Sequence, residues 1–146
     1  MQNSSSSGFK FEMLQIEIDA VLLSVATAQL VEKINRGFKF TIGEATMKDA
    51  LEQGRYIRKG VKVFDAQTKL KYFNAADNAL DSLSYDVEVA LCTGKVTPAE
   101  KAVFDSQFEK VQQQLHGFIT TQINRLKSNK PRKQSSDGGA SEVTSE

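Results

Sequence analysis

The sequence has little of several residue types on which proteins build covalent links or chemical sites. Its 146 residues include one cysteine, Cys92, one histidine, His116, two prolines and no tryptophan. A single cysteine cannot form an internal disulfide, which excludes a disulfide-stabilised extracellular scaffold. A single histidine leaves no histidine pair for a zinc site, and we expect neither a metal ion nor another cofactor. The scarcity of proline and of alternating β-branched stretches favours helix over sheet.

Long hydrophobic runs are also missing. No stretch of 18 consecutive apolar residues occurs, and the serine-rich N-terminus lacks the basic and apolar regions of a secretory signal. We therefore expect a cytoplasmic protein that does not enter a membrane. The remaining composition, with 40% hydrophobic and 25% charged residues, is typical of one soluble domain with its own core.

Residues that could perform catalysis are equally sparse. The nine glycines are scattered and form neither a phosphate-binding loop nor a nucleophile elbow. Cys92 and His116 could in principle form a nucleophile–base pair, but both lie on predicted helices near apolar positions, and we interpret them as a packed thiol and a partly exposed ring. We expect a noncatalytic protein without catalytic residues. Two acidic pairs lie on the predicted third helix: Asp77/Asp81 and Asp86/Glu88. A di-iron bundle would need further histidines, so we interpret these carboxylates as a solvated or partner-facing surface.

The spacing of apolar residues predicts four helices within residues 11–127, with disordered tails at 1–10 and 128–146. Four amphipathic helices with short links predict an all-α, up-down-up-down four-helix bundle. The boundaries of the predicted helices carry recognisable signals. The first helix, 11–34, ends at Asn35-Arg36-Gly37, and the second, 41–63, starts at the capping box Thr41-Ile42-Gly43-Glu44. The third, 68–92, ends at Gly94, and the last starts at Thr97-Pro98-Ala99-Glu100.

Each predicted helix has one expected inner face, which follows a spacing of three and four residues. Glycines on the second helix are expected to allow close helix packing. The expected inner residues are Leu14, Ile18, Val21, Val25, Leu30 and Val31; then Met47, Leu51, Gly54, Ile57, Val61 and Phe64; then Phe73, Ala76, Leu80, Leu83, Val87 and Leu91; and finally Phe104, Phe108, Val111, Leu115, Phe118, Ile119, Gln122, Ile123 and Leu126.

Charge is segregated along the chain although the net charge is only +1. Residues 33–71 hold ten basic and four acidic side chains, and residues 110–133 hold six basic and no acidic ones. On the second helix the basic residues form a stripe, which can contact phosphates, meet an acidic neighbouring subunit, or be an ordinary solvated face. The stripe consists of Lys48, Arg55, Lys59 and Lys62, with Arg58 at its border.

A second basic run lies at the end of the last helix and enters the C-terminal tail. A flexible basic extension is typical of a nucleic-acid arm and equally of a solubilising tail. No aromatic residue is interleaved in this run, so stacking on single-stranded bases is not supported. The run consists of Arg125, Lys127, Lys130, Arg132 and Lys133.

Three segments resemble one protein family. The stretch Phe38-Lys39-Phe40-Thr41-Ile42-Gly43-Glu44 resembles the entry to the second helix of the accessory variability determinant (Avd) proteins of diversity-generating retroelements. The passage Gly94-Lys95-Val96-Thr97-Pro98-Ala99-Glu100-Lys101 and the ending Gln114-Leu115-His116-Gly117-Phe118 are similar to that family's third-to-fourth-helix passage and last helix. The resemblance covers residues 12–126. The four-helix proteins encoded within intervening sequences of large ribosomal RNA genes share the same layout.

The resemblance implies a noncatalytic protein that assembles as a pentamer of four-helix bundles. It also implies binding to a reverse transcriptase and its template RNA, or an RNA/DNA hybrid, in support of mutagenic cDNA synthesis. Because this chain is nearly neutral whereas Avd proteins tend to be strongly basic, an alternative stays open: an oligomeric four-helix-bundle interaction or scaffold protein without nucleic-acid binding. The expected contacts for nucleic acid or partner are Lys48, Arg55, Arg58, Lys59 and Lys62, with Arg125 and Lys127.

Overall fold

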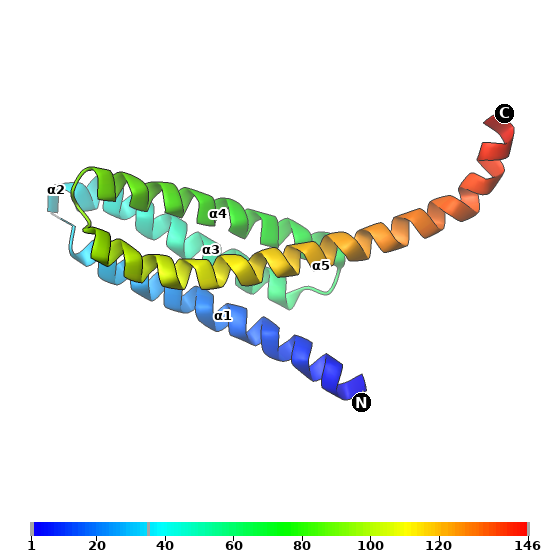
Figure 1. The fold of residues 1–146 in the computed structure, drawn as a ribbon, viewed down its shortest axis with the longest axis horizontal. Helices are drawn as coiled ribbons and strands as arrows, with labels where there is room; N and C mark the ends of the chain where they lie inside the picture. Colours follow the sequence, from blue (N-terminus) through cyan, green and yellow to red (C-terminus); the bar gives the residue numbers. More distant parts are fainter. Residues whose placement is uncertain (1, 35, 146) are drawn as a thin grey trace.

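The computed structural model describes the backbone of residues 2–34 and 36–145, and the side chains of residues 10–34, 37–38 and 41–129. No strand occurs in the described backbone, and four long helices form a bundle, as predicted (Figure 1). The elements are α1 (Gln2–Glu32), α2 (Arg36–Phe38), the π-helical turn η1 (Lys39–Gly43), α3 (Glu44–Lys62), α4 (Ala66–Cys92) and α5 (Pro98–Ser145).

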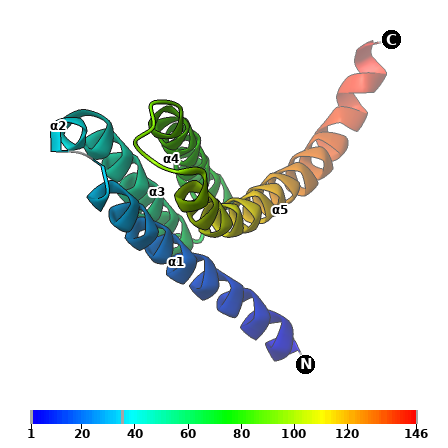
Figure 2. The ribbon, with the colours of Figure 1, turned by 60° about the vertical axis from the view of Figure 1, so that its left-hand side comes forward.

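Successive long helices lie side by side and antiparallel because the links between them are short. Helix α1 packs against α3 and α5, and α4 packs against the same two helices. Figure 2 shows α1 beside α3 and α4 beside α5. The two pairs α1/α4 and α3/α5 therefore occupy the diagonals of the bundle.

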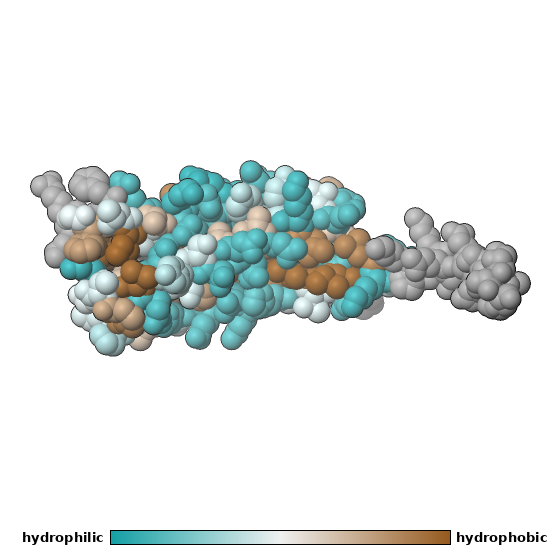
Figure 3. All heavy atoms as spheres, turned by 90° about the horizontal axis from the view of Figure 1, so that it is seen from above, coloured by the Kyte–Doolittle hydropathy of each residue, from teal (hydrophilic) through white to brown (hydrophobic). Residues whose placement is uncertain are grey.

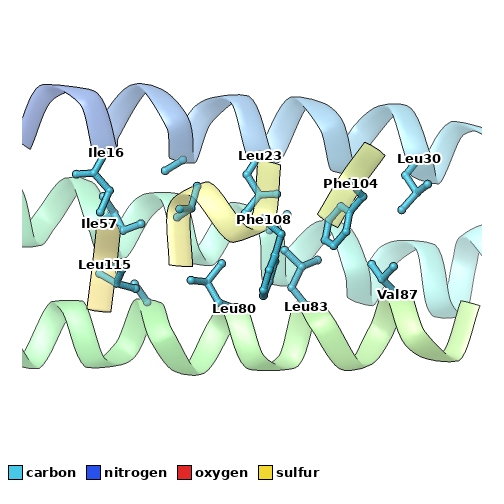
Figure 4. Close-up of a cluster of buried hydrophobic side chains, with 14 of the residues drawn as sticks. Ile16, Leu23, Leu30, Ile57, Leu80, Leu83, Val87, Phe104, Phe108 and Leu115 are labelled. Carbon is cyan, nitrogen blue, oxygen red and sulfur yellow. The ribbon is translucent and has the colours of Figure 1, made fainter. Parts of the chain in front are cut away.

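The core is a continuous column of aliphatic and aromatic side chains from all four helices (Figure 4). Leu23 from α1, Ile57 from α3 and Leu80 from α4 are fully buried within it. The inner faces predicted for α4 and α5 are confirmed from Phe73 to Val87 and from Phe104 to Phe118. Helix α4 presents one apolar series without a competitor, so its buried side follows directly from the spacing.

The inner face predicted for α1 is largely wrong. Leu14, Ile18, Val21 and Val25 are exposed. A second series, offset from the predicted one, faces the core. The hydrophobicity pattern did not indicate this second series because buried polar residues lie beside it. Asp19 is 4% exposed and accepts hydrogen bonds from the side-chain amides of Gln15 on α1 and Gln114 on α5. The buried apolar residues are Met13, Ile16, Ala20, Leu23, Leu30 and Ile34.

The inner face predicted for α3 is displaced by about one residue. Leu51 and Phe64 are exposed, whereas the fully buried Gln53 donates from Nε2 to the carbonyl oxygen of Ala20 at 3.0 Å. The predicted close packing at a glycine is confirmed at Gly60, where a Cβ would lie 2.5 Å from the ring of Phe73. Polar and glycine positions thus make the contacts that the pattern assigned to larger apolar residues.

The start of α5 is formed as predicted. The Thr97 hydroxyl accepts from the amide of Glu100 at 3.1 Å, and the Glu100 carboxylate accepts from the amide of Thr97 at 3.0 Å. This is the reciprocal capping box. The backbone hydrogen bond from Thr97 lowers the pKa of Glu100. Just before it, Gly94 ends α4 with a φ of +75°, which favours glycine.

The capping box predicted at Thr41 and Glu44 is wrong. Residues 36–43 are already helical, so the amide of Glu44 donates to the carbonyl oxygen of Thr41. The Thr41 hydroxyl donates to the carbonyl oxygen of Phe38 at 3.3 Å. Helix α4 also begins earlier than predicted, at Ala66. Its cap is Asp65, whose carboxylate accepts from the amide of Thr68 at 2.9 Å.

A buried lysine joins the end of α3 to the start of α4. Lys69 is 5% exposed, and its Nζ donates to the carbonyl oxygens of Gly60 at 2.7 Å and Val63 at 2.6 Å. Helix C-termini carry unpaired carbonyls and partial negative charge, so an ammonium group is well matched to this place. Burial lowers the pKa of Lys69, and the charge of Arg125 lowers it further.

The terminal segments were expected to be disordered outside a domain at residues 11–127. The backbone of α1 is helical from Gln2, and α5 continues to Ser145, through Pro131 and the pair Gly138-Gly139. Figure 1 shows both ends projecting away from the bundle. Proline and glycine disfavour helix interiors. The disordered tails and these domain limits stay predictions.

Candidate nucleic-acid and partner interface

The basic stripe of α3 lies on the surface of the bundle, as its helical spacing predicted. Lys48, Arg55, Lys59 and Lys62 are all exposed. From Lys48 to Lys62 the stripe extends about 21 Å at 1.5 Å per residue. A row of cations of this length can contact several phosphates along one nucleic-acid strand.

Two of the five predicted contacts on α3 are ion-paired within the chain. Lys48 Nζ lies 3.5 Å from the Glu52 carboxylate one turn away on α3. Arg58 Nε donates to Glu17 Oε2 on α1 at 2.9 Å and so links the two helices. Exposed ion pairs of this kind are weak, and a phosphate can compete for these cations.

The other three stripe residues form no ion pair within the described part of the chain. Arg55 and Lys62 project into solvent. The Lys59 ammonium lies 5.7 Å from the ring centroid of Tyr56 and 5.9 Å from that of Tyr72, which holds it over two aromatic faces. The accessible positive charge of the stripe is therefore concentrated between residues 55 and 62.

The structure separates the second basic segment from this stripe. Arg125 and Lys127 lie on α5, which is diagonal to α3. Arg125 lines a cavity at the end of the bundle together with Val63, which follows α3, whereas Lys127 is exposed. Among the described side chains, Arg125 of the second segment comes near the end of α3 at this cavity. Lys130, Arg132 and Lys133 lie outside the residues whose side chains the structure describes.

Helix α1 has an exposed apolar face, most of which the sequence pattern had assigned to the core. Its spacing of three and four residues matches one side of a helix, and its ends are about 21 Å apart. Contiguous exposed apolar surface of this kind marks interaction sites. The exposed α1 face consists of Phe11, Leu14, Ile18, Val21, Leu22 and Val25.

The same apolar character makes α1 the one segment, among the described residues, that is long and apolar enough to cross a membrane by length and composition. The segment is Lys10–Glu32, and 33% of the qualifying window is buried in the bundle. A core helix of a soluble protein passes this test as well. The two apolar series of α1, one buried and one exposed, account for its high hydropathy.

The acidic surface expected on α4 is partly used within the chain. Asp77 Oδ1 lies 2.9 Å from His116 Nε2, so these residues link α4 to α5. Asp86 faces Asp49 on α3, and burial together with this neighbouring carboxyl raises the pKa of Asp86 to about 7. Asp81 remains exposed. The partner-facing acidic surface is therefore smaller than the sequence indicated.

The described structure does not bring Cys92 and His116, the possible nucleophile and base, together. Cys92 is exposed at the end of α4 rather than packed, and the ring of His116 contacts Asp77 instead. Three or more potential metal ligands are nowhere grouped among the side chains that the structure describes. The fold and these surfaces define an all-α four-helix-bundle protein. No protein-family model matches the chain, and no curated protein matches it either.

Proposed function

We propose that this chain is a noncatalytic, Avd-like accessory protein: an oligomer, pentameric by resemblance, that binds a reverse transcriptase and its template RNA in a diversity-generating retroelement. The observation that carries the proposal is the exposed positive charge on α3. Arg55, Lys59 and Lys62 lie on one face and form no ion pair with the described residues. The four-helix bundle itself agrees with what the resemblance implies.

The mechanism is electrostatic positioning. Lysine and arginine contacts to phosphates release condensed counterions and fix the register of a nucleic acid without reading its bases. RNA held in this way along α3 is presented to a polymerase bound to the same oligomer. Binding is expected to weaken steeply as salt rises, with little dependence on RNA sequence.

The test is fluorescence anisotropy with a labelled structured RNA at several salt concentrations. We expect Arg55→Glu with Lys59→Glu to weaken RNA binding by tenfold or more and to reduce the salt slope. The matched control is Lys71→Glu with Lys110→Glu, which makes the same charge change at exposed positions on α4 and α5. Equal RNA binding by the two double variants overturns the assignment of the stripe. A pull-down with the polymerase tests the second contact in the same way.

A second candidate function is an oligomeric interaction or scaffold protein without nucleic-acid binding. The exposed α1 face favours it, because a second copy of the chain can cover this apolar surface. The variant Leu14→Glu with Val21→Glu is then expected to dissociate the oligomer in size-exclusion chromatography with light scattering. The control Gln29→Glu adds a carboxylate at an exposed polar position of the same helix. An oligomer that survives the double substitution excludes the α1 face as its interface.

A further inference from the structure

A groove of about 260 Å³ lies between α3 and α4, beside the basic stripe. Its lining combines small and polar side chains from the two helices: Glu52 and Tyr56 on α3, with Ala75, Asn78, Ala79 and Ser82 on α4. Helix α4 is uppermost in Figure 1, and the view from above in Figure 3 shows mostly hydrophilic residues along the middle of the bundle. The surface around α4 therefore suits a polar ligand.

The polar side chains on the α4 side of the groove are open to a ligand. Asn78 and Ser82 are exposed, and neither makes a side-chain hydrogen bond with the residues that the structure describes. An amide and a hydroxyl can each donate and accept, so together they suit the edge of any nucleobase. Glu52 adds the one carboxylate of the lining, and Lys48 at 3.5 Å offsets its charge.

Two tyrosine rings connect the groove with the stripe. The Lys59 ammonium lies 5.7 Å from the ring centroid of Tyr56 on α3 and 5.9 Å from that of Tyr72 on α4, so both rings lie beside one cation. Tyr56 lines the groove, and both tyrosines are only half-buried, which leaves part of each ring accessible. Aromatic rings beside a positively charged groove hold single-stranded nucleic acids by stacking on successive bases, with little sequence preference.

The neighbouring cations lie where phosphates of such a strand would pass. Arg55 and Lys62 are exposed, each about one helical turn from Lys59, and neither forms an ion pair with the described residues. Tyr56 and Lys59 are about 60° apart around the axis of α3, at 3.6 residues per turn. The aromatic groove and the cationic row are therefore adjacent faces of one helix.

We propose that the groove between α3 and α4 is a stacking site for single-stranded RNA. One base lies in the groove against the ring of Tyr56, its neighbour stacks on Tyr72, and the connecting phosphates contact Lys59 and Arg55. This site rests on the proposed function, because the stripe supplies its phosphate contacts, and it specifies that the bound RNA is unpaired. Phosphate contacts alone favour a duplex, whose charge density is higher.

The test is fluorescence anisotropy of the full chain with three labelled probes of equal length. They are a 12-nucleotide RNA of adenine and cytosine, which cannot pair with itself, an abasic strand with the same phosphates, and the duplex with the complementary strand. We expect the single strand to bind about tenfold tighter than the abasic strand, because only the former stacks, and tighter than the duplex.

Tyrosine fluorescence gives an independent measurement of stacking. The chain has three tyrosines and no tryptophan, so its emission comes from tyrosine alone. A base stacked on a tyrosine ring quenches that emission. We expect quenching by the single strand but not by the abasic strand. Tyr85→Phe is expected to retain it, because this variant leaves Tyr56 and Tyr72 as the emitting residues.

Variants separate the rings from the charges. Tyr72→Leu is expected to weaken single-strand binding five- to tenfold at every salt concentration without changing the salt slope, whereas Tyr72→Phe keeps the ring and the affinity. The matched control is Tyr85→Leu, the same change at a tyrosine of α4 that is 71% exposed and outside the groove. Asn78→Ala is expected to weaken binding several-fold, and Asn74→Ala, at an exposed position outside the lining, to leave it unchanged.

A preference for the single strand that is lost in Tyr72→Leu and kept in Tyr72→Phe and Tyr85→Leu establishes the site. Equal binding of the single and abasic strands, absence of quenching, or tighter binding of the duplex overturns it. Equal thermal midpoints of the two Tyr72 variants exclude unfolding as the cause of lost binding, and quenching in the unsubstituted chain tests stacking without any variant.

The same experiment separates this site from the function on which it rests. RNA binding that is lost in Arg55→Glu with Lys59→Glu, yet is equal for the single and abasic strands, overturns the stacking site and leaves the proposed function standing. If none of the three probes binds, both are overturned.

Discussion

Gln122 on α5 is fully buried, and neither its amide nitrogen nor its amide oxygen has a hydrogen-bond partner among the residues that the structure describes. A buried polar group without a partner costs about 1–3 kcal/mol. Gln122→Met keeps the length of the side chain and removes the unpaired atoms, so we expect the free energy of unfolding in urea to rise by about 1 kcal/mol. Gln113→Met, at an exposed position of the same helix, is expected to change little. A destabilised Gln122→Met chain would contradict this account.

Asp86 and Asp49 make stability depend on pH. Burial and the neighbouring Asp49 raise the pKa of Asp86 from 3.8 to about 7 in the folded protein. Between these values the folded state binds more protons than the unfolded state, so the contribution of Asp86 to stability falls as pH rises from about 4 to about 7. Asp86→Asn removes this loss, and we expect a higher thermal midpoint than the parent at pH 8 and a nearly equal one at pH 4.

Asp81→Asn is the matched control for this prediction, because Asp81 is exposed on the same helix. It removes a carboxylate of α4 without touching Asp49. If Asp86→Asn changes the thermal midpoint equally at both pH values, the carboxyl pair is not the cause.

At the scale of the element, the start of α5 depends on two reciprocal hydrogen bonds between Thr97 and Glu100. Thr97→Ala removes the hydroxyl acceptor and is expected to lower the free energy of unfolding by about 1 kcal/mol, whereas Thr97→Ser keeps the acceptor and most of the stability. Thr41→Ala is an informative comparison, because Thr41 caps no helix and is expected to cost less. Chemical denaturation of the three variants under one condition decides the order.

The same elements explain which parts of the fold were predictable. Helix α4 and the start of α5 follow from a single apolar series and from a cap whose two partners are three residues apart. Helix α1 does not, because it carries two apolar series and the core selects the one containing the small Ala20 and the hydrogen-bonded Asp19. Choosing between two series requires knowledge of the neighbouring helices, which no local pattern contains.

The candidate site was predictable to a similar degree. Helical spacing places the α3 cations on one exposed face, as the structure confirms for Lys48, Arg55, Lys59 and Lys62. The ion pair between Arg58 and Glu17 joins residues 41 positions apart and depends on the packing of α1 against α3. The cavity beside Arg125 likewise arises only where all four long helices and the α3–α4 link meet, so its apolar wall had no signal in the sequence.

At the scale of the whole molecule, the two candidate functions differ in the response to RNA that they predict for one measurement: light scattering at low and high salt, with and without RNA. Burial of the exposed α1 face between copies is hydrophobic and therefore resists salt. RNA bound along the α3 stripe depends on counterion release and is lost as salt rises. The accessory-protein proposal thus predicts an oligomer that keeps its mass in high salt and gains mass with RNA only in low salt.

A salt-resistant oligomer that ignores RNA supports the scaffold function alone, since the apolar face is then used and the stripe is not. An oligomer that dissociates in high salt contradicts the α1 interface, because charge pairs would then hold the subunits together. A monomer under all four conditions contradicts both assignments. Repeating the measurement with the double variant Leu14→Glu and Val21→Glu tests whether α1 forms the oligomer interface. If this variant loses the oligomer and keeps RNA binding, the subunits assemble through α1 and the nucleic acid contacts α3.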